Sequence, residues 1–368
     1  METAMANSEE RLHDQTLDLL RTAADREASD VHLVPGYPIT FRVHGRLESS
    51  DGPVLEPMTV RKMVASIVSE RTAAKIAGEK NCDFSVSITH HDQPCRFRGN
   101  VFYSQEHLCA CLRHVPNDIP TWDWMGFPPP LAERLISYRN GLVILTGVTG
   151  SGKSTTLAAL VNRLNEKGAF RVITVEEPIE YVHQRISTSM ITQREVGRDV
   201  DSFYDGLKYG LRQDPDVLLI GEIRDRETAR MALSAAETGH LILTTLHTKD
   251  AKGAVTRLVD LFPHEAQDDV RAQLALSLRA VVSQHLVPSA SDGEKRVLVI
   301  ETMHVNQPVR IAIKFGKIDS IESAIQTGRR DGMMTLDEDL QRKVTAGLIT
   351  LESARRFAKD PDTLTRTG

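Results

Sequence analysis

Short apolar runs alternate with segments of helical periodicity from about residue 131 onward. Apolar residues fill most positions of four such runs, at residues 142–146, 171–175, 217–220 and 240–246. Runs of this length and content are typical of strands buried on both faces of a sheet. Residues 155–164 follow the first run and have apolar side chains at helical spacing. The alternation predicts an α/β domain with a mostly parallel sheet and crossover helices.

Beyond residue 250 the pattern becomes mainly helical. Residues 265–285, rich in Leu, Val and Ala, are predicted to form a single helix, and residues 296–301 a further strand. The tail from Leu336 onward is predicted to be a small helical cap.

The first third of the chain has a different pattern, with alternating apolar and polar positions. It predicts a small α+β unit with an antiparallel sheet, preceded by a loose leader at residues 1–8. The predicted helices are residues 9–27, 57–70 and 70–77, and the predicted strands are residues 31–34, 39–43, 83–88, 95–103 and 108–114.

A proline-rich stretch at residues 116–130 interrupts these patterns. It contains five prolines and both tryptophans, Trp122 and Trp124, which we expect to pack at a domain boundary. The predicted domains are therefore residues 1–115 and 131–368, with residues 116–130 as the linker. A length of 368 residues is compatible with about two or three domains.

Composition and charge exclude several classes of protein. The net charge of −5 argues against bulk nucleic-acid binding, which favours a basic surface. No stretch approaches the roughly 18 consecutive apolar residues of a membrane span, and the N-terminus has no secretory signal pattern. The four cysteines lack paired spacing, so we expect buried, reduced thiols and no zinc site; they are Cys82, Cys95, Cys109 and Cys111.

The most specific motif is GVTGSGKS at residues 147–154, which has the spacing of a phosphate-binding P-loop. It lies between a predicted strand and a predicted helix, as the motif requires. Its glycines let the backbone wrap around an anion, and the helix N-terminus adds partial positive charge. The predicted nucleotide-binding residues are Gly147, Thr149, Gly150, Ser151, Gly152, Lys153, Ser154 and Thr155. Lys153 is expected on the β- and γ-phosphates, and Ser154 on Mg²⁺.

Two acidic segments follow the P-loop. Glu222 ends an apolar strand, the position at which nucleotide hydrolases hold Mg²⁺, whereas Asp216 precedes that strand and is interpreted as a turn residue. The segment ITVEEPIEY at residues 173–181 carries Glu176, Glu177 and Glu180. From chemistry alone, any of these three could orient an attacking water, or all could belong to a solvated loop.

Two histidines, His240 and His247, flank the last apolar run. They could be ordinary structural histidines, or they could sense phosphate and carry a signal between sites. Chemistry alone leaves both interpretations open.

Together these features resemble the secretion ATPase superfamily, and within it the pilus retraction ATPases of PilT/PilU type. The resemblance extends from about residue 28 to residue 345. Besides the P-loop, it is carried by ASDVHL (28–33), FRVHGR (41–46), VEEPIEY (175–181), QREV (193–196), QDPD (213–216), GEIRD (221–225), AETGH (236–240), TLHT (245–248) and SAIQT (323–327).

The resemblance implies an N-terminal PAS-like domain followed by a RecA-like P-loop ATPase domain. It implies a homo-hexameric ring with ATP or ADP and Mg²⁺ as ligands, acting on an inner-membrane pilus platform protein from the cytoplasmic side. By carry-over, Glu180 is the catalytic glutamate and Glu222 the Walker B glutamate. His240 and His247 occupy the histidine-box positions, and Arg98 and Arg113 are candidates to reach the phosphates.

Two departures from the family pattern bear on the direction of force. Glu177 stands where the family usually has Asp, and residues 308–317 keep only part of the retraction motors' AIRNLIR-like segment. Pilus-assembly and type II secretion motors usually add an N-terminal domain and a four-cysteine zinc loop, neither of which this sequence shows. The sequence therefore favours an ATPase driving pilus retraction; a pilus-assembly or type II secretion ATPase and a weakly hydrolysing, nucleotide-loaded scaffold remain as alternatives.

Overall fold

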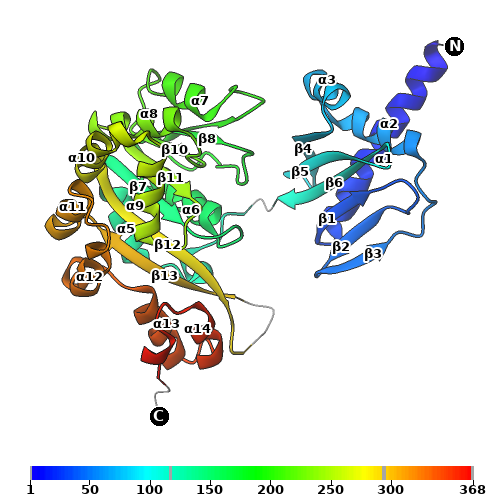
Figure 1. Cartoon of the computed structure of the whole chain (residues 1–368). Coiled ribbons are helices and arrows are strands. Elements are labelled where there is room, and N and C mark those ends of the chain that lie inside the picture. The colour runs from blue at the N-terminus through cyan, green and yellow to red at the C-terminus, as the bar shows by residue number, and fades with distance from the viewer. Residues whose placement is uncertain (1, 116–117, 292–295, 366–368) are drawn as a thin grey trace. The chain divides into compact units, whose positions relative to one another are not determined.

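The computed structural model describes residues 2–115, 118–291 and 296–365, with side chains from residue 11 onward. The chain forms two compact units, Met1–Asp118 and Ile119–Gly368 (Figure 1). The first two residues of the predicted linker, 116 and 117, lie outside the described residues.

The first unit is built on a six-stranded antiparallel sheet in the order β3-β2-β1-β6-β5-β4. Alternate strand residues such as Val31, Phe97 and Leu112 are buried in one core together with residues of α1 and α2. The strands are β1 (Ala28–Leu33), β2 (Thr40–Val43), β3 (Arg46–Ser49), β4 (Asn81–His90), β5 (Gln93–Ser104) and β6 (His107–Val115). The helices are α1 (Glu2–Asp25), α2 (Pro57–Ile67) and α3 (Glu70–Gly78). The predicted α+β class is confirmed.

The predicted loose leader is wrong, because α1 already begins at Glu2. The leader residues include Glu, Ala and Met, which have high helix propensity, and they extend a helix whose later turns are packed. Leu20 and Ala23 in those later turns are fully buried.

The second unit is built on a seven-stranded sheet in the order β13-β12-β7-β11-β10-β8-β9, in which only β13 runs antiparallel to its neighbour. The strands are β7 (Gly141–Thr146), β8 (Arg171–Glu176), β9 (Met190–Glu195), β10 (Val217–Ile220), β11 (Leu241–Leu246), β12 (Leu278–Pro288) and β13 (Arg296–His304). The strands predicted from the four apolar runs are thus confirmed as one parallel sheet.

Both faces of this sheet are covered by helices (Figure 1). In β7, Leu142 and Ile144 face one core, while Val143 and Leu145 face the other. This double burial explains why the strands are apolar at successive positions. One core includes α7 (Phe203–Gly210), α8 (Arg226–Glu237), α9 (Ala251–Asp260), α10 (Gln267–Ser277), α11 (Gln307–Lys314) and α12 (Ser320–Thr327). The other includes α4 (Trp122–Met125), α5 (Pro129–Ser137) and α6 (Lys153–Lys167).

The single helix predicted at residues 265–285 is wrong in its second half. Helix α10 ends at Ser277, and Leu278 begins β12, which pairs with β7 and β13. An apolar run buried from both sides has no periodicity that distinguishes a helix from a strand. Pairing with β7 and β13 therefore determines that these residues form a strand. The predicted C-terminal cap is confirmed: α13 (Leu336–Thr345) and α14 (Leu351–Phe357) pack against β12 and β13.

Residues 119–130 of the predicted linker lie in the second unit. Phe127 is buried in its core, Trp122 packs against the same core, and Trp124 is 78% exposed.

The four cysteines are free thiols on the sheet of the first unit. Three are buried and Cys111 is half-buried, and burial raises the pKa of each thiol. Across the described residues, no helix is both long and apolar enough to span a bilayer.

Candidate active site

The P-loop joins the end of β7 to the start of α6. Gly147, Gly150 and Gly152 have positive φ angles of 148°, 79° and 88°, which side chains rarely adopt. A Cβ on Gly147 would lie 2.5 Å from the carbonyl oxygen of Gln284, so this position has room for glycine alone. Helix α6 starts at Lys153 without a side-chain cap, leaving its N-terminal amides available to an anion.

Lys153 lies across this loop rather than in solvent. Its Nζ donates to the carbonyl oxygens of Gly147, at 2.9 Å, and Val148, at 3.1 Å. Burial lowers the pKa of Lys153, while the negative charges of Glu222 and Glu180 act in the opposite direction. Two acidic residues, one following β10 and one following β8, therefore both act electrostatically on the P-loop lysine.

The remaining P-loop side chains differ in exposure. Thr149 and Ser154 are exposed and Thr155 is half-buried. Ser151 is buried, and its Oγ has no hydrogen-bond partner within the part of the chain that the structure describes. An orphaned buried hydroxyl beside a glycine cradle is a feature that a bound phosphate would satisfy.

Glu222 follows β10 and lies at the same edge of the sheet as the P-loop. Its side chain is only 12% exposed. One carboxylate oxygen forms an ion pair with Arg224 at 2.5 Å, and the other lies 3.2 Å from Nε2 of His247. The structure thus brings together Glu222 and His247, which sequence analysis had selected separately.

Asp216 and Glu176 have structural partners. Asp216 accepts from the backbone amide of Arg171 at 2.7 Å, in keeping with its interpretation as a turn residue. Glu176 accepts from Thr174 at 2.6 Å and from Gln193 at 3.2 Å. Glu177 lies 3.5 Å from Arg224.

In the acidic segment, the Glu180 carboxylate accepts no hydrogen bond from any residue that the structure describes. Its negative charge nevertheless acts on Lys153. The segment that carries it is held from both sides. Gln193 donates to the Tyr181 carbonyl at 2.7 Å, and the Tyr181 hydroxyl lies 3.1 Å from Oγ1 of Thr155. Glu180 is therefore positioned against the P-loop helix while its carboxylate stays available.

The sequence pattern of the family described as "Type II/IV secretion system protein" matches residues 6–361. The chain belongs to this family. Among relatives, "Type IV pilus retractation ATPase PilT" of Pseudomonas aeruginosa is 40% identical over 94% of this chain and 98% of its own length. "Uncharacterized protein YggR" of Escherichia coli is 39% identical over 90% of this chain and 99% of its own length.

Two solved structures of similar proteins share the fold. The pilus retraction motor PilT with bound ADP has a TM-score of 0.86 and 39% identity, covering 95% of this chain and 99% of that one. The Legionella pneumophila ATPase DotB has a TM-score of 0.82 and 29% identity, covering 93% and 94%. These similarities confirm the resemblance to pilus retraction ATPases and the predicted fold class.

The two candidate histidines, His240 and His247, lie at opposite ends of β11. His247 follows the strand and reaches Glu222, whereas His240 precedes the strand and bonds to the Ala235 carbonyl at 3.2 Å. Seven residue steps along the strand separate them, which corresponds to about 23 Å. Within one chain, His240 is not brought to the P-loop.

Arg98 and Arg113 lie directly opposite each other on β5 and β6 of the first unit. The Arg113 Nε donates to Oδ1 of Asp30 at 2.8 Å, although its side chain is 70% exposed. Arg98 is half-buried. Their approach to phosphate stays a prediction.

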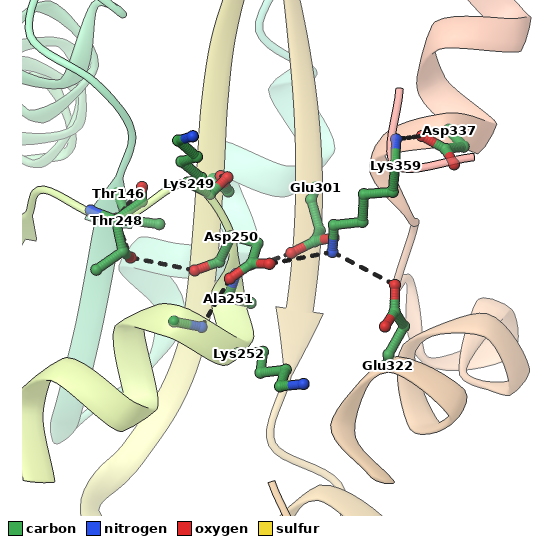
Figure 2. Close-up of polar contacts among 12 residues, drawn as sticks. Thr146, Thr248, Lys249, Asp250, Ala251, Lys252, Glu301, Glu322, Asp337 and Lys359 are labelled. Atoms are coloured by element: carbon green, nitrogen blue, oxygen red, sulfur yellow. Dashed lines mark hydrogen bonds and ion pairs between the residues drawn. The ribbon is translucent and has the colours of Figure 1, made fainter. Parts of the chain in front are cut away.

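Sequence analysis missed a cluster of charges on the C-terminal segment (Figure 2). Lys359 Nζ lies 2.8 Å from Glu301, 3.4 Å from Asp250 and 3.6 Å from Glu322. Burial alone would lower the pKa of Lys359, but these carboxylates, Glu301 first, raise it overall. No local pattern could have revealed the cluster, because its members are distant in sequence.

The same cluster is connected to the P-loop (Figure 2). Thr248 donates through its hydroxyl to the carbonyl of Asp250 at 3.2 Å. Thr146, the residue before Gly147, donates to the Thr248 carbonyl at 2.8 Å. A continuous set of contacts therefore links the C-terminal segment, the loop that carries His247 and the start of the P-loop.

Proposed function

We propose that this chain is a Mg²⁺-dependent ATPase that drives type IV pilus retraction by coupling hydrolysis to domain rotation. The observation that carries the proposal is the convergence of Lys153, Glu222 and Glu180 at a glycine loop in which Gly147 leaves no room for a Cβ. The 40% identity to a pilus retraction ATPase over nearly the whole of both chains supports it.

The predicted P-loop residues would bind the triphosphate chiefly through backbone amides, and Lys153 would leave its two carbonyl partners for the β- and γ-phosphates. The exposed Ser154 hydroxyl and the Glu222 carboxylate suit Mg²⁺, since this ion prefers oxygen ligands. When bound, Mg²⁺ neutralises charge on the phosphates.

Glu180 would orient the attacking water and accept its proton. Its carboxylate is available, whereas Glu176 is held by two side chains. Catalysis would then consist mainly of positioning and of electrostatic stabilisation of the transferred phosphoryl group. His247, in contact with Glu222, would report the state of the γ-phosphate to the loop that follows β11.

The working form would be a homo-hexamer at the cytoplasmic face of the inner membrane, pulling on a pilus platform protein and binding no nucleic acid. Arg98 and Arg113 of the first unit would approach phosphate in that assembly. His240 is distant from the P-loop of its own chain, so its role would be to relay signals at the other edge of the sheet.

Steady-state ATPase assays and calorimetry on purified protein test this proposal. Lys153→Ala should abolish turnover, and Glu180→Gln should retain ATP binding and lose hydrolysis. Normal turnover by Lys153→Ala would exclude the P-loop as the hydrolysis site. Full activity of Glu180→Gln would show that another residue is the general base. Particle size measured in the same samples tests the ring.

Glu177 is the feature that supports the alternative of a weakly hydrolysing scaffold. Its arm is one methylene longer than Asp, and it lies 3.5 Å from the arginine that also pairs with Glu222. A wild-type turnover rate close to background, rising severalfold in Glu177→Asp, would favour the scaffold. Gene deletion separates the motor alternatives, because loss of retraction leaves many pili and loss of assembly leaves none.

A further inference from the structure

Three side chains of the first unit converge on one point. Asp25 is the last residue of α1, and His90 and His91 lie at the tip of the hairpin that joins β4 to β5. The Nε2 atoms of His90 and His91 lie 2.8 Å and 3.3 Å from the same carboxylate oxygen, Oδ1 of Asp25. All three potential ligand atoms lie within 4.8 Å of one another.

We propose that Asp25, His90 and His91 bind a divalent transition-metal ion, Zn²⁺ in particular. Zn²⁺ bonds imidazole nitrogen and carboxylate oxygen at about 2.0–2.2 Å in tetrahedral geometry, which places neighbouring ligand atoms roughly 3.3 Å apart. The two distances from imidazole nitrogen to the Asp25 oxygen, 2.8 Å and 3.3 Å, are close to this value. A set of two imidazoles and one carboxylate also binds Zn²⁺ in preference to Mg²⁺.

The site is largely built before any metal binds. The His90 side chain is only 15% exposed. His91 has a φ of 47° and Asp92 a φ of 58°, so a tight two-residue turn fixes the backbone that presents the second imidazole. The His91 side chain is 80% exposed, which leaves an open path from solvent and room for a water ligand.

The local charge also favours a cation. Asp25 ends a long helix, where the backbone dipole is negative. Arg21, one turn earlier in α1, is engaged by Asp18 at 2.6 Å and by the Thr89 carbonyl at 3.3 Å.

A metal here would join α1 to β4, the edge strand of the first sheet. The ligands come from positions 65 and 66 residues apart, so binding would close a long loop and stabilise the first unit. This consequence is independent of ATP hydrolysis.

Calorimetric titration of the full-length chain with ZnCl₂ tests the site, using protein freed of its purification tag, nucleotide and metals. We expect one Zn²⁺ per chain whose affinity falls at least about tenfold in Asp25→Asn and His91→Asn. Co²⁺ should give the absorption bands of a nitrogen–oxygen site, without a thiolate charge-transfer band, which separates it from binding by cysteine.

His44→Asn is the matched control. His44 is exposed and has the same φ of 47° as His91, so Asn costs the backbone equally at both positions. Zinc affinity equal to wild type in His44→Asn, together with loss in His91→Asn, supports the site. If wild type binds no Zn²⁺, or if all variants bind it equally, the proposal is overturned.

Discussion

The Nζ of Lys359 lies 2.8 Å from Oε2 of Glu301, although 58 residues separate them in sequence. The Glu301 side chain is only 2% exposed, and its other oxygen accepts from the amide of Ala251 at 2.8 Å. One buried carboxylate thus holds both the C-terminal segment and the start of α9. Because a buried charge without its partner is costly, each member of the pair depends on the other.

Removal of the Lys359 charge should therefore strongly destabilise the second unit. Lys359→Met is expected to lower the free energy of unfolding of the second unit by about 3–5 kcal/mol, measured by urea denaturation at neutral pH. The pKa of Lys359 is raised above its ordinary 10.5, so its contribution is fully present below that pH and is lost as pH rises through the raised value. Lys317→Met, at an exposed position, should change stability by less than about 0.5 kcal/mol. Equal stabilities of the two variants would contradict a role for the pair.

The hydrogen bond between Tyr181 and Thr155 should position Glu180. Tyr181→Phe keeps the ring and removes only the hydroxyl that lies 3.1 Å from Thr155. A hydrogen bond of this kind contributes about 0.5–1.5 kcal/mol, so kcat should fall about two- to tenfold with little change in KM.

A double-mutant cycle with Thr155→Val isolates this contact. The two substitutions should be non-additive in kcat, because either one removes the same hydrogen bond. Additive effects would show that Tyr181 acts by another route.

Substitution of Arg98 or Arg113 in the first unit should lower kcat far more than substitution of an ordinary surface residue. If either reaches phosphate in the assembled ring, its substitution by Ala should lower kcat by a factor on the order of 10³–10⁵. Arg113 also pairs with Asp30, so Asp30→Asn serves as its control: it breaks the same ion pair but keeps the arginine. A loss as large in Asp30→Asn as in Arg113→Ala would assign Arg113 a structural role.

His304 should make the second unit sensitive to mild acid. Burial first, then the charge of Arg134, lower the pKa of His304 from 6.5 to about 4. The unfolded chain therefore binds one more proton than the folded chain between these pH values, and stability falls as pH falls through this window. The contribution is about 3 kcal/mol. His304→Gln should flatten the dependence of unfolding free energy on pH, and His264→Gln, at an exposed position, should not.

The strands of the second unit were predictable because double burial makes them apolar at successive positions, as in β7 and β10. The same property made residues 278–288 ambiguous, and the prediction of helix there was wrong. The P-loop was predictable because its chemistry resides in consecutive residues. Gln193 was noted only as part of a family stretch, since its bonds to Glu176 and Tyr181 join segments that local patterns treat separately.

By itself, the sequence determined the fold class and the family and picked out the candidate nucleotide-binding residues, because strand burial and phosphate binding are local requirements written in short patterns. Only the tertiary structure decided which acidic residue keeps a free carboxylate, which histidine reaches Glu222, and how Lys359 joins the P-loop network. These relationships depend on chain segments that folding brings together across tens of residues. Hydrogen bonds and ion pairs over such separations leave no periodic trace in the order of amino acids.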